Sequence, residues 1–315
     1  MATLSAEQIQ EYCDNGILVI ENVFTDEEVT HIREGLHAQL QEHGMNHERL
    51  LAGLDVPPSG TRLKSESASF FYRKWKLDAQ LNERVYRYAK DLLVRTYGQR
   101  IAGFDHPFGT FNQVLAYMDR INYRLPDHIR AEGGLGLHLD RNPIDPYLQN
   151  STGLKKWRPI QGLITLTDHY GANCGGLQVV RGFHKRIDDY FRSSRDDPIY
   201  ACGGEFTRLV SKNHTALSKL LETIQAPLGS LIMWDNRLPH ATCEHLLGNE
   251  TREVIYTAYL PDVTLNRAYW QEQAKNLGKN IHPPAYIKDP KAVGDRDWDE
   301  KDLNELQKQL LLNKG

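Results

Sequence analysis

Cysteine is scarce in this sequence, and none of it is arranged in a recognisable motif. Among 315 residues there are four cysteines, at Cys13, Cys174, Cys202 and Cys243. No two of them have the C-x-x-C spacing, which argues against a zinc knuckle, and so few thiols argue against a disulfide framework. We therefore expect reduced thiols and a cytoplasmic location.

Long apolar runs and an excess of one charge are also missing. The longest apolar runs, such as residues 228–234, are far shorter than the roughly 20 residues that span a membrane. The 38 basic and 41 acidic residues leave a net charge of -3, which offers no electrostatic case for binding nucleic acid or an anionic membrane. No repeat or low-complexity segment divides the chain. These absences predict one domain with neither nucleic acid nor a membrane as its partner, and we expect a monomer or homodimer.

The first hundred residues have the pattern of helices. Capping boxes at Ser5 and Thr25 predict the starts of two helices, and residues 17–20 between them form an apolar strand candidate. An apolar stripe over residues 81–96 predicts a third helix, which we expect Asp78 to cap and Gly98 to end. Residues 44–64 have no clear period and predict a loop.

From about residue 104 the pattern changes to short strands separated by turns. Strands are predicted at residues 111–117, 135–140, 160–167, 177–180, 228–234, 238–244 and 251–260. Many short strands favour a mainly β core of the sandwich or jelly-roll type, here with helical flanks. We expect a helical part over 1–103, a β core over 104–261 and a helical tail over 262–315, all in one domain.

One histidine and one carboxylate are spaced as metal ligands. His138 and Asp140 form the only H-x-D triplet among 13 histidines, and in a strand both side chains point to the same side. His240, after an apolar strand, is the best third ligand, with His245 as the alternative. Two histidines and one carboxylate on one face of a metal are typical of iron(II) oxygenases. By themselves, His138 and Asp140 could also be a surface pair.

An arginine follows on a strand that alternates cleanly. Arg252 shares one face of residues 251–260 with apolar and small side chains, so its charge points inward. A buried guanidinium needs an anionic partner, and its fork fits the end of a dicarboxylate, with the Thr242 hydroxyl able to add a hydrogen bond. The alternative is a cross-strand ion pair with an aspartate or glutamate.

These motifs together resemble the phytanoyl-CoA dioxygenase family of iron(II)/2-oxoglutarate oxygenases. The resemblance covers about residues 104–261 and rests on His138-x-Asp140, the glycines of Gly175-Gly176-Leu177, the Gly182-Phe183-His184-Lys185 stretch, and His240-x-Thr242 followed by Arg252. It implies a double-stranded β-helix (a cupin-like jelly roll). It also implies that His138, Asp140 and His240 bind iron(II), and that 2-oxoglutarate chelates the iron with its far carboxylate on Arg252.

The resemblance also suggests where other side chains lie. The family places a basic or amide side chain before the first ligand strand, facing the 2-oxo acid end, and Asn122 and Arg124 match that position loosely; a polar strand end explains them equally well. The loop of residues 141–158 follows the first ligands, so Arg141 and Trp157 are substrate-contact candidates, unless these are merely solvated loop residues. The long stretch 181–227 departs from the family pattern and is a candidate lid or cover.

The activity implied by the resemblance is hydroxylation of an sp3 carbon, with O2 and 2-oxoglutarate consumed and succinate and CO2 released. We expect a small polar or anionic substrate; an acyl-CoA or a protein is the alternative. A halogenase would need a small residue where Asp140 stands. A zinc or manganese cupin would leave Arg252 without a dicarboxylate, and a non-catalytic binding module would leave the ligand set unexplained.

Overall fold

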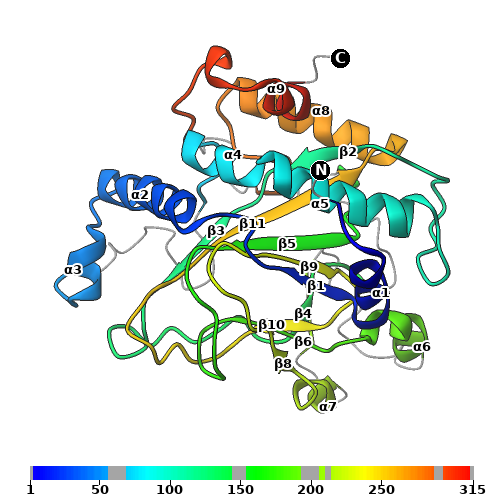
Figure 1. Ribbon diagram of the computed structural model, residues 1–315, viewed down its shortest axis with the longest axis horizontal. Helices are drawn as coiled ribbons and strands as arrows, with labels where there is room; N and C mark the ends of the chain where they lie inside the picture. Colours follow the sequence, from blue (N-terminus) through cyan, green and yellow to red (C-terminus); the bar gives the residue numbers. More distant parts are fainter. Residues whose placement is uncertain are drawn as a thin grey trace.

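The strands of the protein form two antiparallel sheets, and helices cover the outer face of the larger one (Figure 1). This computed structural model describes residues 3–55, 69–143, 154–192, 206–209, 214–286 and 294–312. The metal-ligand candidates lie on the smaller sheet and Arg252 lies on the larger one. The packing of one sheet on the other therefore decides whether the metal-ligand candidates and Arg252 lie in one site.

The larger sheet has six strands among the described residues, in the order β1-β9-β5-β11-β2, with β3 also paired to β11. Its strands are β1 (Ile17–Ile20), β2 (Val114–Tyr117), β3 (Ile121–Arg124), β5 (Ile160–Thr165), β9 (Leu231–Asp235) and β11 (Arg252–Pro261). The ten-residue strand β11 pairs with β5 along one edge and with β3 and then β2 along the other. It therefore connects the Arg252 end of the sheet to the β2 end.

The smaller sheet has the order β7-β4-β10-β6-β8. Its strands are β4 (His138–Leu139), β6 (Leu177–Val179), β7 (Thr207–Arg208), β8 (Glu222–Thr223) and β10 (His240–Thr242). An apolar cluster between the sheets takes Leu163, Trp234 and Val254 from the larger sheet and Leu139 and Val179 from the smaller one. Burial of this cluster holds the two sheets face to face.

Helices pack on the other face of the larger sheet, above it in Figure 1. They are α2 (Asp26–Glu42), α4 (Lys74–Gln80), α5 (Glu83–Leu93), α8 (Thr264–Gly278) and α9 (Glu305–Leu311). The remaining described α-helices are α1 (Ala6–Asn15), α3 (His47–Leu51), α6 (Ile187–Arg192) and α7 (Thr215–Ser218), and a π-helical turn η1 (Val94–Gly98) extends α5. Within the described ranges, none of the helices has the length and apolarity that a membrane crossing requires.

The local sequence signals located the first two helices correctly but not the start of the third. The capping boxes of Ser5 and Thr25 are both formed, so those two predictions are confirmed. The prediction that Asp78 caps the third helix is wrong. Asp78 lies inside α4, where it pairs with Lys74, and the cap of α5 is Asn82, whose side chain accepts a hydrogen bond from the Arg84 backbone N–H.

Each predicted strand region contains a strand, and β1 at residues 17–20 is also confirmed. The strand β1 pairs with β9, so the helical N-terminal part supplies an edge strand to the core. The predicted loop over 44–64 contains α3, and the short strands β3, β7 and β8 were not predicted as strands. The strands β7 and β8 have two residues each and β3 has four, which is too little sequence to show a clear alternation.

Candidate active site

Two histidines face each other across a pair of short strands. His138 on β4 and His240 on β10 are directly paired in the register, and their ring centroids are 4.1 Å apart. Asp140 follows β4 by one residue, and its carboxylate oxygens lie 3.6 Å from His138 Nε2 and 3.7 Å from His240 Nε2. The period of two in β4 and the pairing of β4 with β10 thus bring the three predicted ligands together.

The backbone orients both imidazole rings. Nδ1 of His138 lies 2.7 Å from the carbonyl oxygen of Gly136, and Nδ1 of His240 lies 3.0 Å from that of Leu238. A carbonyl only accepts, so each Nδ1 carries the proton and each Nε2 presents a lone pair toward the space beside Asp140. This is the tautomer that binds a metal through Nε2.

The electrostatics of the three groups suit a divalent cation. Burial and the neighbouring His240 lower the pKa of His138 to about 3, so this ring is neutral at physiological pH. Burial raises the pKa of Asp140, but the two histidines and Arg158 outweigh it and hold the pKa below its usual value. Two imidazoles and one carboxylate within one cluster form a facial ligand set for iron(II).

Arg252 points into the same cavity as the three ligands. The cavity has a volume of about 450 Å³, and His138, Asp140, His240, Thr242 and Arg252 all contribute to its lining. Arg252 is only 2% exposed, and its Nη1 donates a 2.5 Å hydrogen bond to Oδ1 of Asn122. In the part of the chain that the structure describes, no carboxylate lies within ion-pair distance of its guanidinium. The cross-strand ion pair considered above is therefore absent there.

The other predicted positions divide into those near the cavity and those away from it. Asn122 contacts Arg252, as described. Arg124 does not line the cavity: its guanidinium donates to the carbonyls of Cys243 and Glu244 and to Asp127. These contacts do not support the prediction that Arg124 faces the 2-oxo acid, because its guanidinium is hydrogen-bonded to the turn after β10. The alternative ligand His245 is exposed and pairs with Asp127, away from the metal ligands.

The predicted substrate residues lie in a neighbouring cavity. Arg141 and Trp157 line a second cavity of about 230 Å³, and Trp157 packs against the ring of His106. Residues 144–153 of the predicted substrate loop lie outside the described residues. The side chain that reaches the main cavity is Arg158, one position beyond Trp157, and it lines both cavities.

Part of the long 181–227 stretch reaches the mouth of the main cavity. Phe206 stacks on His138 with ring centroids 4.6 Å apart and is 39% exposed, and Arg208 is paired with His138 across β7 and β4. Both residues line the cavity. Two residues of this stretch therefore lie at the cavity, and its role as a lid or cover stays a prediction; residues 193–205 and 210–213 lie outside the described residues.

Sequence comparison identifies the family. The family model of phytanoyl-CoA dioxygenase (PhyH) matches residues 12–246, three quarters of the chain. The chain belongs to the phytanoyl-CoA dioxygenase family. The match begins well before residue 104, where the resemblance was expected to start, and it includes His138, Asp140, His240 and Thr242. Arg252 lies beyond it, so the role of Arg252 depends on the structure.

Solved structures with the same fold are distant in sequence. A structure of GlcNAc Inducible Gene 2 (DUF1479) from Candida albicans is 17% identical, with a TM-score of 0.76 over 98% of this chain and 76% of the other. A hypothetical protein from Escherichia coli is 18% identical, with a TM-score of 0.73 over 98% and 82%. SnoK, a non-heme alpha ketoglutarate dependent carbocyclase of nogalamycin biosynthesis, is 15% identical, with a TM-score of 0.51 over 82% and 84%. No curated protein matches the sequence.

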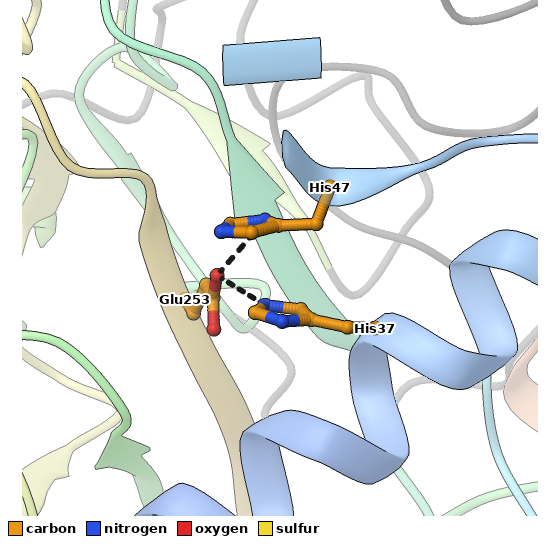
Figure 2. A group of neighbouring side chains, drawn as sticks. All are labelled: His37, His47 and Glu253. Atoms are coloured by element: carbon orange, nitrogen blue, oxygen red, sulfur yellow. Dashed lines mark hydrogen bonds and ion pairs between the residues drawn. The ribbon is translucent and has the colours of Figure 1, made fainter. Parts of the chain in front are cut away.

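A second cluster of possible metal ligands, two histidines and a glutamate, lies on the outer face of β11. His37, His47 and Glu253 are the other group in the described residues with ligand atoms close enough for a metal. Figure 2 shows the two rings one above the other, with the Glu253 carboxylate beside their edges. The ring centroids are 3.7 Å apart and the planes differ by only 13°. A metal binds in the plane of each imidazole ring, so rings stacked in this way cannot direct lone pairs at one ion.

The partners of Glu253 indicate a structural role instead. Its Oε2 accepts a 2.9 Å hydrogen bond from Arg33, and its Oε1 lies 2.9 Å from Nε2 of His37 and accepts a 2.6 Å bond from Thr251. The carboxylate is fully buried, and these partners lower its pKa to about 2, although burial alone would raise it. The network ties α2 to the residue next to Arg252.

We expect Glu253→Gln to lower the free energy of unfolding by about 3 kcal/mol at pH 7, which corresponds to the difference between a pKa of about 2 and the unfolded value. A lowered folded pKa stabilises the protein above the unfolded pKa of about 4.3, and this contribution is lost as the pH falls toward 2. Urea unfolding of both proteins at several pH values should therefore show the difference shrinking below pH 4.3. A difference independent of pH would contradict the ion-pair account. The exposed Glu272→Gln is the control.

Gly175 lies against the stem of Arg252 in a conformation that other residues avoid. Its φ is +65°, and an added Cβ would stand 3.3 Å from Cδ of Arg252. We expect Gly175→Ala to cost about 1–2 kcal/mol of stability and to weaken 2-oxoglutarate binding, because the methyl group displaces the arginine. Gly171→Ala is a matched control, since Gly171 has φ +85° with open space around it. Equal 2-oxoglutarate affinity in the two variants would show that Gly175 does not position Arg252.

Proposed function

We propose that this protein is an iron(II)- and 2-oxoglutarate-dependent oxygenase that hydroxylates an sp3 carbon of a small metabolite. The observation that carries the proposal is one cavity holding both a two-histidine, one-aspartate cluster and a buried arginine without a carboxylate among its described partners. Family membership supports the reaction type. The two facing sheets support a double-stranded β-helix as the description of the core.

Different side chains would bind the metal and the co-substrate. His138, Asp140 and His240 would hold iron(II), and Arg252 would bind the far carboxylate of 2-oxoglutarate, oriented by its hydrogen bond to Asn122. Thr242 lines the cavity on the same side. When bound, iron(II) and 2-oxoglutarate together activate O2, so that 2-oxoglutarate, O2 and R–H become succinate, CO2 and R–OH. The apolar walls, including Leu163 and Trp234, exclude bulk water from the reacting groups.

The cavity favours this function over the alternatives. Asp140 occupies the position at which a halogenase needs a small residue. A zinc or manganese cupin would give the buried Arg252 no dicarboxylate to bind, and a non-catalytic binding module would not explain the three metal-ligand candidates. The volume is near the lower end of ligand pockets, roughly 300–1,000 Å³, which favours a small substrate over a protein. A cytoplasmic location, a monomeric or homodimeric state and the absence of nucleic-acid partners remain predictions from the sequence.

The test is succinate formation from 2-oxoglutarate by the purified protein, with iron(II) and air. We expect slow succinate release without a second substrate, faster release when a substrate from a metabolite panel fits, and none after chelation of the metal. The control variant Asp262→Ala should behave as wild type, because this carboxylate pairs with Arg267 and does not line the cavity. No succinate above the chelated sample, with or without the panel, would contradict the proposal.

A further inference from the structure

The main cavity has a second end, far from Arg252. Tyr117, Asp119, Arg120, Arg158 and Tyr286 line this end. On β11, Arg252 pairs with Arg124, whereas Ala258 pairs with Tyr117. These two positions are six residues apart, so Arg252 and Tyr117 are separated by about 20 Å along the strand. A five-carbon dicarboxylate bound at Arg252 and at the metal leaves the Tyr117 end open.

Arg158 has an unbonded guanidinium nitrogen among the described residues at this end. Its side chain is 11% exposed and lies over the ring of Tyr117 at 5.1 Å. Its Nη2 is 3.6 Å from Oδ2 of Asp140, and its Nη1 donates no hydrogen bond to any described residue. Once Asp140 ligates a metal, its negative charge is directed to that metal. The guanidinium then needs another anion.

Asp119 is already engaged and does not meet this need. Its Oδ1 accepts hydrogen bonds from the Tyr286 hydroxyl at 2.5 Å and from the Arg120 backbone N–H at 2.8 Å. Its Oδ2 accepts a 2.9 Å bond from Gln161 and is 4.0 Å from Nη1 of Arg158, beyond hydrogen-bond reach. Asp119 therefore fixes Tyr286 and the cavity wall, and leaves Arg158 directed at the cavity.

The net charge of the cavity lining also favours a bound anion. Among the residues that the structure describes, the lining contains the four arginines Arg120, Arg158, Arg208 and Arg252 and the two carboxylates Asp119 and Asp140. Iron(II) and the 2-oxoglutarate dianion would cancel one another. An excess of two positive charges then remains in a partly enclosed, low-dielectric space, which favours a bound anion.

We propose that Arg158, with Arg120 lining the same cavity, binds a carboxylate of the substrate that is oxidised, so that this substrate is a small organic acid. This inference rests on the proposed function and specifies its substrate class. Arg120 stacks on Tyr286 with its guanidinium carbon 4.4 Å from the ring centroid, so an aromatic wall adjoins the two cations. Because Nη2 of Arg158 is 3.6 Å from Oδ2 of Asp140, the bound carboxylate would lie close to the metal ligands, and the rest of the acid would occupy the Tyr117 end of the cavity.

The test measures binding without turnover. Wild-type protein loaded with iron(II) and 2-oxoglutarate under nitrogen is titrated with a fixed set of small carboxylic acids of varied shape, each beside its primary amide. We expect acids to bind in clear preference to their amides, and Arg158→Gln to weaken the best acid about 10- to 100-fold while leaving its amide unchanged. Arg267→Gln, an exposed arginine paired with Asp262, is the control and should bind as wild type.

Two results would overturn the inference. The first is that the amides bind the wild-type protein as tightly as the acids do. The second is that the Arg158→Gln protein retains full affinity for the acids. If Arg158→Gln does not fold, Arg120→Gln provides the same comparison. The absorption band of iron-bound 2-oxoglutarate is recorded in each sample. Its absence would count against the proposed function, whereas a normal band without acid preference would count only against this inference.

Discussion

Asp140→Ala is expected to abolish succinate formation and to leave a folded protein. The carboxylate is one of three ligand groups, and its oxygens lie within 3.7 Å of both histidine Nε2 atoms. Its loss removes the only negative charge in the set and breaks the facial geometry, so iron(II) affinity should fall by more than about 100-fold. The measurements are iron content after dialysis, succinate release and the circular dichroism spectrum.

The control for this variant is Asp127→Ala, a carboxylate that pairs with Arg124 and His245 and does not contact the ligands. It should keep iron binding even if its stability falls. Wild-type succinate release by Asp140→Ala would show that the ligand assignment is wrong. Arg158 would also lose its nearest carboxylate in this variant, so the melting temperature should be reported with the activity.

Arg252→Met is expected to weaken 2-oxoglutarate binding by two or more orders of magnitude while iron still binds. Breaking a buried charge pair from one side typically costs about 3–5 kcal/mol, and each 1.4 kcal/mol is about tenfold in affinity. Iron binding should survive because no ligand is removed. Titration of 2-oxoglutarate into the iron-loaded protein under nitrogen gives the dissociation constant.

Arg124→Met is the matched control for this experiment. Arg124 is the cross-strand partner of Arg252, is equally buried and carries the same charge, but its contacts are backbone carbonyls and Asp127. We expect Arg124→Met to lower stability and to leave 2-oxoglutarate affinity near wild type. If the two variants lose the same affinity, Arg252 has no special role and the co-substrate assignment fails.

The part of the site that could be predicted from the sequence is the part with local periodicity. His138 and Asp140 share a side because strand side chains alternate, and the same alternation placed Arg252 inward. His240 is about 100 positions away, so local periodicity could not place it next to His138; in the structure the two residues are paired across β10 and β4. The role of Arg124 could not be predicted in the same way. Its guanidinium binds the carbonyls of the turn after β10, and the sequence does not show where that turn lies relative to β3.

The substrate end of the cavity was beyond sequence analysis for a physical reason. Asp119 and Tyr286 are 167 positions apart and meet only because α8 returns the chain across β2. Arg208 reaches the cavity through the two-residue pairing of β7 with β4, and Phe206 directly precedes β7. The loop prediction at Arg141 and Trp157 came within one residue of Arg158, because which side chain turns inward before β5 is decided by packing and not by composition.

Joint binding of iron(II) and 2-oxoglutarate in one cavity is tested most directly by an anaerobic titration of the wild-type protein. Iron(II) is added first and then 2-oxoglutarate, following the visible metal-to-ligand absorption band that forms when the keto acid chelates the iron. We expect a band that saturates at one 2-oxoglutarate per protein and that is absent in Asp140→Ala. A protein that binds iron(II) but develops no band at saturating 2-oxoglutarate would contradict joint binding.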